Sequence, residues 1–345
     1  MSLPAITRTA TTETRYLDRF GQLWRRAGTE LDRSIRVLDF VRQFLIWAPQ
    51  LSGSSVRQYR ATIRFGLERF ARHNPHLRAE VAEALTLLDG SRQQDPAPAP
   101  RGKPKASIPL RTSASKAKGI SDADFDRIIA AAPLYRSQYN EDLVGFMRAT
   151  IVTGHRPIEW HGTTITITGD TLIMIVPNAK NSNDRAHGPT RTLIFEKLDP
   201  VSRDHLLAWT ERVNSLSRKD YQALLERIEE RMHIVTRALF PRRKRWPTPY
   251  SLRHACSGRL KRHFIGHARS QEERDLGAAI VAALMGHAAD DTASHHYGSS
   301  QGSGGRSYPI PKADPEEVAR IRPKLAESRN RMRVMIAARR TPAPR

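Results

Sequence analysis

The chain is divided by a segment, residues 91–120, in which the helical recurrence of apolar residues stops. Its first part alternates proline with alanine, and from Arg101 to Ile120 it carries basic side chains and no acidic one. Proline keeps a chain extended and like charges repel one another, so this segment is predicted to be an extended linker. At 345 residues the chain is long enough to place one domain on each side of it.

The segment before the linker, residues 1–90, is predicted to be all helical, because apolar residues recur in three stretches at helical spacing. These are Tyr16, Phe20, Leu23 and Ala27, then Ile35, Leu38, Val41 and Leu45, and finally Val56, Tyr59, Ile63, Leu67 and Phe70. Ser54 or Ser55 is expected to cap the third helix. Arg57, Arg60 and Arg64 fall on another face of that helix, which suits contact with phosphates, although a merely solvated basic face explains each arginine equally well.

The segment after the linker is predicted to combine helices with a small sheet. Ser121 and Asp124 resemble a capping box, and a helix is expected over residues 141–152, ending at Gly154. Runs of β-branched residues predict strands at 163–167, 171–176 and 190–195. Helical patterns return over residues 203–239 and again after Tyr250. The predicted fold class is therefore mainly α with a small antiparallel β-sheet.

The charge of the chain constrains its partner more than its fold. The 57 Lys and Arg residues outnumber the 35 Asp and Glu, for a net charge of +22, which favours nucleic acid or an anionic membrane surface. No run approaches the roughly 18 apolar residues of a spanning helix, and the N-terminus lacks the apolar region of a secretory signal. One cysteine, Cys256, permits no internal disulfide, so a cytoplasmic protein is expected.

Four motifs follow one another after the linker. They are Thr153–Trp160 (TGHRPIEW), Lys180 between two predicted strands, Tyr250–His254 (YSLRH), and Leu284–His287 (LMGH) with Tyr297 ten positions later. In this order they resemble the tyrosine recombinase (phage integrase) family, whose members share TG-x-R-x-x-E, a lysine on a β-hairpin, H-x-x-R-H, and G-H shortly before a nucleophilic tyrosine. The resemblance covers roughly Ser121 to Gly298, and its strength lies in the order of the four motifs, since each alone is weak evidence.

The resemblance implies a role for each residue. Tyr297 is the nucleophile that forms a 3′-phosphotyrosyl bond, and Lys180 protonates the leaving 5′-oxygen. Arg156 and Arg253 hold the scissile phosphate, because guanidinium forks match phosphate oxygens and stay charged. His287 donates a hydrogen bond to the same phosphate.

Supporting residues and one departure from the family accompany this set. Glu159, three residues after Arg156, is expected to orient the site. Tyr250 stands where the family usually has histidine or lysine, and a phenol carries no positive charge. His254 is a candidate to take over part of that role. The distance from His287 to Tyr297 is also about one residue longer than the family pattern.

Each assignment has a rival in the sequence. Arg185 and Arg191 lie in the same region as Lys180, and Tyr308 is close to Tyr297. Arg156 and Arg253 are, taken singly, also compatible with ordinary surface arginines, and His287 with a buried structural histidine. No metal or other cofactor is expected, because the His295–His296 pair has no spaced set of further ligands around it.

The family's architecture is the expectation for the whole chain. It comprises a helical core-binding domain (1–90), a basic linker (91–120) with DNA-contacting Arg101, Lys103 and Lys105, a catalytic domain (121–305), and a basic C-terminal tail (306–345). The two domains are expected to form a C-shaped clamp on double-stranded DNA, within a homo-tetramer on paired sites. The apolar face of the tail from Val318 to Met335 fits docking on a neighbouring chain, or folding back on its own domain.

The predicted function is site-specific DNA recombination, in which strands are cut and rejoined through Tyr297. A related tyrosine transesterase, either a type IB topoisomerase or a telomere resolvase, is the first alternative. A DNA-binding protein that has lost catalysis, as Tyr250 would allow, is the second. An accessory protein that sets the direction of recombination is a further expected partner.

Overall fold

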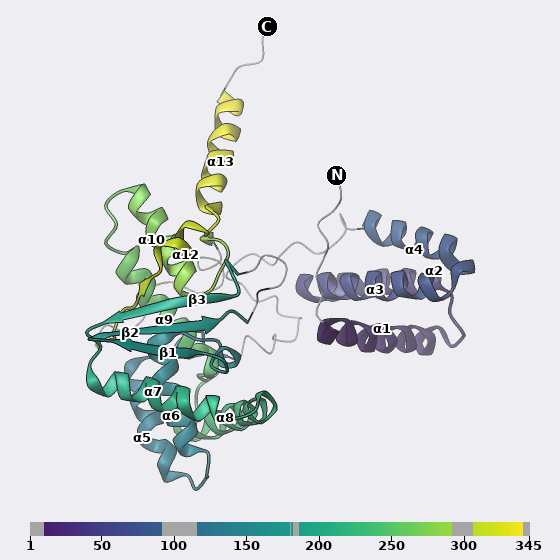
Figure 1. Cartoon of the computed structure of the whole chain (residues 1–345). Coiled ribbons are helices and arrows are strands. Elements are labelled where there is room, and N and C mark those ends of the chain that lie inside the picture. Colours follow the sequence, from purple (N-terminus) through teal and green to yellow (C-terminus); the bar gives the residue numbers. More distant parts are fainter. Residues whose placement is uncertain (1–9, 92–115, 180, 182–185, 292–305, 341–345) are drawn as a thin grey trace. The chain divides into compact units, whose positions relative to one another are not determined.

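The computed structural model describes residues 10–91, 116–179, 181, 186–291 and 306–340 (Figure 1). The chain separates into two compact units, Met1–Pro109 and Leu110–Arg345. The first is helical, and the second combines helices with a four-stranded antiparallel sheet. The predicted fold class, mainly α with a small antiparallel sheet, is confirmed. In the described part of the chain, no helix combines the length and the apolarity needed to cross a bilayer.

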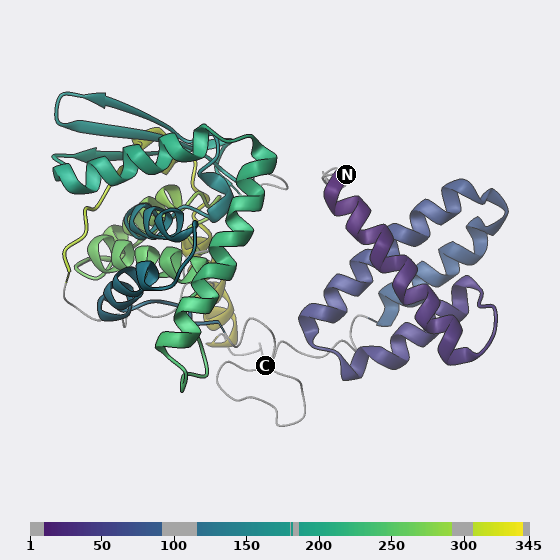
Figure 2. The ribbon, with the colours of Figure 1, turned by 90° about the horizontal axis from the view of Figure 1, so that it is seen from below.

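The first unit is a small helical bundle (Figure 2). Its helices are α1 (Ala10–Leu31), α2 (Val37–Trp47), α3 (Gly53–His73) and α4 (Arg78–Gly90). The predicted apolar stripes meet in one core around Phe40, Phe44 and Ile63. The predicted cap of α3 was placed too late: Ser52, rather than Ser54 or Ser55, accepts a hydrogen bond from the Ser55 amide at 3.2 Å.

The predicted phosphate-facing arginines of α3 have different environments. Arg57 is exposed, but Arg60 is only 8% exposed and donates to the carbonyl of Leu88 and to Ser91. Arg64 pairs with Asp89. The prediction is wrong for Arg60, because α4 packs against this face and the carbonyls at its C-terminal end take up the guanidinium. Arg101, Lys103 and Lys105 lie outside the described residues.

The second unit places helices against one face of its sheet. The helices are α5 (Asp122–Ala131), α6 (Asn140–Thr153), α7 (Pro200–Asn214), α8 (Arg218–Leu239), α9 (Pro249–Phe264), α10 (Gln271–Leu284), α12 (Pro315–Ala319) and α13 (Lys324–Arg340). The strands are β1 (Thr164–Thr168), β2 (Thr171–Pro177), β3 (Thr190–Glu196) and β4 (Lys312–Ala313), in the order β1-β2-β3-β4. Ser121 caps α5 as predicted, by accepting from the Asp124 amide at 3.1 Å.

Alternation along the central strands explains how the sheet is covered. On β2, Leu172, Met174 and Val176 are buried, whereas Ile175 between them is 45% exposed. Met174 is paired with Leu193 of β3, so that both contribute to the same core beneath the sheet. This period-two pattern is what a sheet with one packed face requires.

The C-terminal segment departs from the prediction of one continuous helical face. Its residues form β4, which pairs with β3 at Leu193 and Ala313, and then α12, after which Pro323 separates α12 from α13. Ile321 packs with Ala282 and Ala283 of α10. Residues 306–322 therefore fold back on their own unit. Val318 and Ile321 pack within the chain, which agrees with the alternative of folding back on its own domain, and docking of the tail on a neighbouring chain stays a prediction.

Candidate active site

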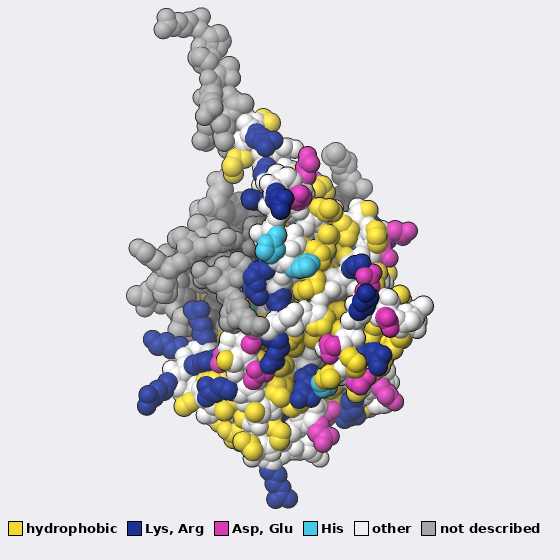
Figure 3. Space-filling model, turned by 90° about the vertical axis from the view of Figure 1, so that its left-hand side faces the viewer, with side chains coloured by type: hydrophobic (Ala, Val, Ile, Leu, Met, Phe, Trp, Pro, Cys, Tyr) yellow, Lys and Arg dark blue, Asp and Glu magenta, His cyan; other side chains and the backbone are white. Residues whose placement is uncertain are grey.

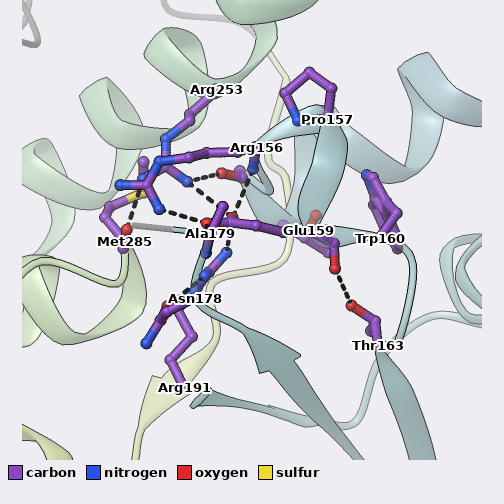
Figure 4. A network of polar contacts seen from close by, with 12 residues as sticks. Arg156, Pro157, Glu159, Trp160, Thr163, Asn178, Ala179, Arg191, Arg253 and Met285 are labelled. Atoms are coloured by element: carbon purple, nitrogen blue, oxygen red, sulfur yellow. Dashed lines mark hydrogen bonds and ion pairs between the residues drawn. The ribbon is translucent and has the colours of Figure 1, made fainter. Parts of the chain in front are cut away.

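Three arginines from separate elements meet around one carboxylate (Figure 4). Arg156 follows α6, Arg191 is on β3, and Arg253 is on α9. Arg191 Nη2 lies 2.7 Å from Glu159 Oε2, Arg253 Nη1 lies 3.6 Å from the same oxygen, and Arg156 pairs with Oε1. We call these four residues the arginine cluster. Their side chains are at most 7% exposed.

The turn after α6 carries Arg156 and Glu159 into contact. Gly154 ends the helix with φ of +68°, and a side chain there would place its Cβ 2.9 Å from Cys256 Sγ. This position therefore requires glycine both for its backbone and for space. Pro157 then begins a short 3-10 turn, Pro157–Glu159, and the Arg156 amide donates to Glu159 Oε2 at 2.7 Å. Local hydrogen bonding thus holds the carboxylate beside Arg156.

The charge of the arginine cluster is unbalanced. Burial alone would raise the pKa of Glu159, but the Arg191, Arg253 and Arg156 guanidiniums outweigh it and hold that pKa well below its usual value. Among the described residues, the ion pairs of all three guanidiniums go to Glu159. Three cations around one anion leave buried positive charge, an arrangement that a bound anion would relieve. Within the same described part, Arg156 Nε and Arg191 Nε are buried without a hydrogen-bond partner.

His287 joins the cluster from the end of α10. Its Nε2 lies 3.4 Å from Arg253 Nη2, and the residue is 3% exposed. Burial, and then Arg253 and the other two guanidiniums, hold the pKa of His287 well below its usual value, so the ring is neutral at neutral pH. Arg253 also donates to the carbonyls of Gly154, at 2.5 Å, and Met285, at 2.6 Å. It therefore ties the end of α6 to the turn before His287.

The segment between β2 and β3 makes polar contacts next to the cluster at both of its described ends. Ala179 N donates to Glu159 Oε1 at 3.2 Å, directly after Asn178. At the other end, His187 Nδ1 lies 3.3 Å from the carbonyl oxygen of His287. His187 Nε2 lies 3.3 Å from Glu317 of α12, which also accepts from the Thr192 amide at 2.9 Å. The C-terminal segment is thus connected to His287 through a buried histidine.

Comparison with known proteins gives a likeness in structure. No family model and no curated protein sequence matches the chain. Among solved structures, it is similar to XerH site-specific recombinase bound to difH substrate, described as a pre-cleavage complex, with a TM-score of 0.43 and 14% identity over 80% of this chain and 73% of that one. A post-cleavage complex of XerH with palindromic difH gives a TM-score of 0.44 and 13% identity over 81% and 73%.

The remaining predicted site residues have different positions. Tyr250 lies in the first turn of α9, three residues before Arg253, and is 38% exposed. The ring of His254 packs edge-on against the Tyr250 ring, with 5.8 Å between the ring centroids. Lys180 and Tyr297 lie outside the described residues. Tyr308, the rival of Tyr297, has its ring 4.2 Å from the Arg259 guanidinium.

Sequence reasoning placed Arg156, Glu159, Arg253 and His287 at one site, and the structure brings these four together. It missed Arg191 as a member of the cluster, and considered it only as a rival of Lys180. A signal was present: Arg191 has the same strand parity as Leu193 and Phe195, so it points to the packed side of β3. His187 and Glu317 had no such signal, because their contact joins residues 130 positions apart.

Proposed function

We propose that this protein is a site-specific DNA recombinase that cleaves and rejoins strands through a 3′-phosphotyrosyl bond at Tyr297. The observation that carries the proposal is the convergence of Arg156, Arg253 and His287, three residues from separate motifs, in a buried cluster with excess positive charge. A phosphodiester in a cleavage transition state is an anion that needs this kind of partner.

The proposed reaction assigns one task to each group. The phenol of Tyr297 loses its proton to solvent and its oxygen forms a bond to phosphorus. The bond from phosphorus to the 5′-oxygen breaks, and Lys180 gives that oxygen a proton. Arg156 and Arg253 stabilise the charge on the non-bridging oxygens. His287 is neutral and donates a hydrogen bond to one of them. The phosphotyrosyl ester retains the energy of the broken bond, so rejoining requires no ATP.

Double-stranded DNA is the proposed partner, and several chains on paired sites are the expected assembly. On the described residues of the face in Figure 3, Lys and Arg side chains gather at the lower left, and elsewhere they alternate with acidic and hydrophobic ones. With a net charge of +22, affinity for DNA should fall steeply as salt rises, because each neutralised phosphate releases counterions.

Covalent capture tests the proposal without knowledge of the target sequence. Purified full-length protein is incubated with nicked duplexes of randomised sequence, in which a small fragment diffuses away after cleavage and traps the adduct. We expect a denaturation-resistant protein–DNA species, whose DNA is then sequenced to give the target site. Tyr297→Phe should abolish it, whereas Tyr308→Phe, the matched control, should retain it.

The other outcomes distinguish the alternatives. An adduct that survives Tyr297→Phe overturns the assignment of the nucleophile. Adducts at unrelated sequences, together with relaxation of supercoiled plasmid, indicate a type IB topoisomerase. Sequence-selective binding without any adduct between about pH 6 and pH 9 indicates a DNA-binding protein without catalysis, because that range spans the ordinary titration of histidine and cysteine side chains and approaches that of tyrosine.

A further inference from the structure

Arg191 is a fully buried member of the arginine cluster, and both of its Nη atoms donate to other residues of the chain. Its side chain is 0% exposed, and it points from β3 toward the core side of the sheet. Nη1 donates to Asn178 Oδ1 at 2.8 Å, and Nη2 donates to Glu159 Oε2 at 2.7 Å (Figure 4). One guanidinium therefore bridges the turn after α6 and the end of β2.

Asn178 is in turn hydrogen-bonded to two backbone carbonyls. Its amide nitrogen donates to the carbonyl of Pro189 at 2.8 Å, and its Nδ2 donates to that of Gly188 at 3.0 Å. The next residue, Ala179, donates its amide to Glu159 Oε1. Four atoms of the surrounding structure, all within the described residues, thus hold Asn178 and Ala179 through their backbone and the Asn178 side chain, and the residue that follows in the sequence is Lys180.

The turn before His287 is fitted against the same pair. Gly286 has φ of +65°, and a Cβ there would overlap Asn178 Oδ1 and lie 3.0 Å from Arg191 Nη1. The Arg191–Asn178 contact is therefore close to parts of all four motifs. Arg191 binds Glu159, which also pairs with Arg253. Asn178 lies two residues before Lys180 in the sequence and against the Gly286 turn. Burial lowers the pKa of Arg191 and the neighbouring arginines add to this, whereas Glu159 opposes it.

We propose that Arg191 is a positioning residue for the cleavage reaction, which sets the Asn178–Ala179 backbone at a fixed place relative to Glu159 so that the following lysine can protonate the leaving 5′-oxygen. The inference rests on the proposed function. Arg191 acts on proton delivery through the backbone, without touching the phosphate. A planar fork is required, because only two donors held at a fixed angle satisfy Asn178 and Glu159 together.

The test replaces the leaving oxygen by sulfur. On a duplex with a 5′-bridging phosphorothiolate at the captured cleavage site, the leaving group is a thiolate. Thiols, such as that of cysteine with a pKa near 8.5, are far more acidic than alcohols, so this group departs without a proton. The variants are Arg191→Lys, which keeps the charge and loses the fork, and Asn178→Ala, which leaves the buried charges in place. Lys180→Ala is the reference variant, because it removes the proposed proton donor itself. Arg231→Lys is the matched control, because Arg231 is a buried arginine remote from the cluster that donates to Asn140 Oδ1 at 2.8 Å.

We expect Arg191→Lys to slow adduct formation on the ordinary duplex by a factor on the order of 10², the usual cost of a small misplacement at a reacting centre. Asn178→Ala should show a smaller loss. On the sulfur duplex both variants, like Lys180→Ala, should come within a few-fold of the unaltered protein, and Arg231→Lys should be close to it on both duplexes.

Three results would overturn the inference. Equal slowing of Arg191→Lys on both duplexes would mean that Arg191 acts on phosphate charge or only on folding. A normal rate on the ordinary duplex would mean that charge alone suffices. If Arg191→Lys does not fold, absence of sulfur rescue in Asn178→Ala decides against it. Absence of any adduct with the unaltered protein on either duplex is a different failure, that of the proposed function itself.

Discussion

Both units of this protein bury arginines, but the groups that surround the buried guanidiniums differ between the two units. In the first unit Arg60 is surrounded by neutral acceptors, the carbonyl of Leu88 and both oxygens of Ser91, at the end of α4. In the second unit the ion pairs of Arg156, Arg191 and Arg253 with described residues all go to Glu159.

The difference separates a structural arginine from one available to a ligand. A buried cation that has only neutral acceptors and no other cation around it stabilises the contact between two helices, and it has little to offer a phosphate. A cluster with more cations than anions is costly to bury and gains most from an anion that arrives later. Burial alone does not distinguish the two cases, since Arg60 and Arg156 are 8% and 6% exposed.

The sharpest test of this contrast removes the anion. Glu159→Gln removes the carboxylate that the ion pairs of all three guanidiniums share among the described residues, and it should lower the free energy of unfolding by about 3–5 kcal/mol at neutral pH. The pKa of Glu159 is depressed in the folded state, so its contribution is present above the unfolded pKa and is lost as pH falls through the folded one. Urea unfolding should therefore show a constant difference from neutral pH down to about pH 5, which shrinks progressively as pH falls below the ordinary value of 4.5 and closes only well below it. A difference that already closes near pH 6 would contradict this account.

Removing a cation from the same cluster should have the reverse effect on stability. Arg156→Met is expected to reduce adduct formation by roughly 10²–10³-fold, comparable to loss of an oxyanion-hole donor. Its melting temperature should stay the same or rise, because repulsion with Arg191 and Arg253 is relieved. Single-turnover cleavage and calorimetry measure the two quantities. A variant that loses activity only in proportion to its loss of folded protein would place Arg156 with the structural arginines.

Arg60→Met supplies the other side of the comparison. Here the oxygens of Ser91 and the carbonyl of Leu88 lose the Arg60 donor, although that carbonyl still accepts from Ser91 Oγ at 2.9 Å, and the loss should cost about 1–3 kcal/mol. Amide hydrogen exchange in α3 and α4 of the full chain should show the loss as faster local opening. The rate of DNA cleavage by the folded fraction, measured at saturating DNA, should be unchanged. A reduced cleavage rate would mean that this arginine has a second role.

The smallest expected effect concerns the link from α12 to His287. Glu317→Gln keeps the shape of the side chain but weakens its hydrogen bonds to Thr192 and its contact with His187, at a cost of about 1 kcal/mol. Cleavage should slow by a few-fold, because the His287 carbonyl lies against the same histidine. Thr192→Val is the control, since it removes only a hydroxyl that Glu317 accepts from at 2.9 Å. Equal rates for the two variants would show that the charge of Glu317 plays no part.

The sequence predicted those parts of the fold and site that depend on local pattern. The strand predicted from the β-branched run at residues 171–176 matches β2 to within a residue, and the order of the four motifs grouped Arg156 with Arg253 and His287. It did not predict the partners of Arg60, because a helical wheel locates a second face without saying what packs on it. The two-residue strand β4 was missed for a related reason, since so short a strand has no period to detect.

The excess of buried cations also affects how the protein behaves before it meets DNA. Small inorganic oxyanions, such as sulfate, that occupy the arginine cluster only in the folded state will raise the melting temperature in proportion to the logarithm of their concentration, once this exceeds the dissociation constant. The same ions compete with the backbone of a nucleic acid for the cluster. Preparations kept in sulfate should thus be the most durable on storage and the least active when assayed without dialysis.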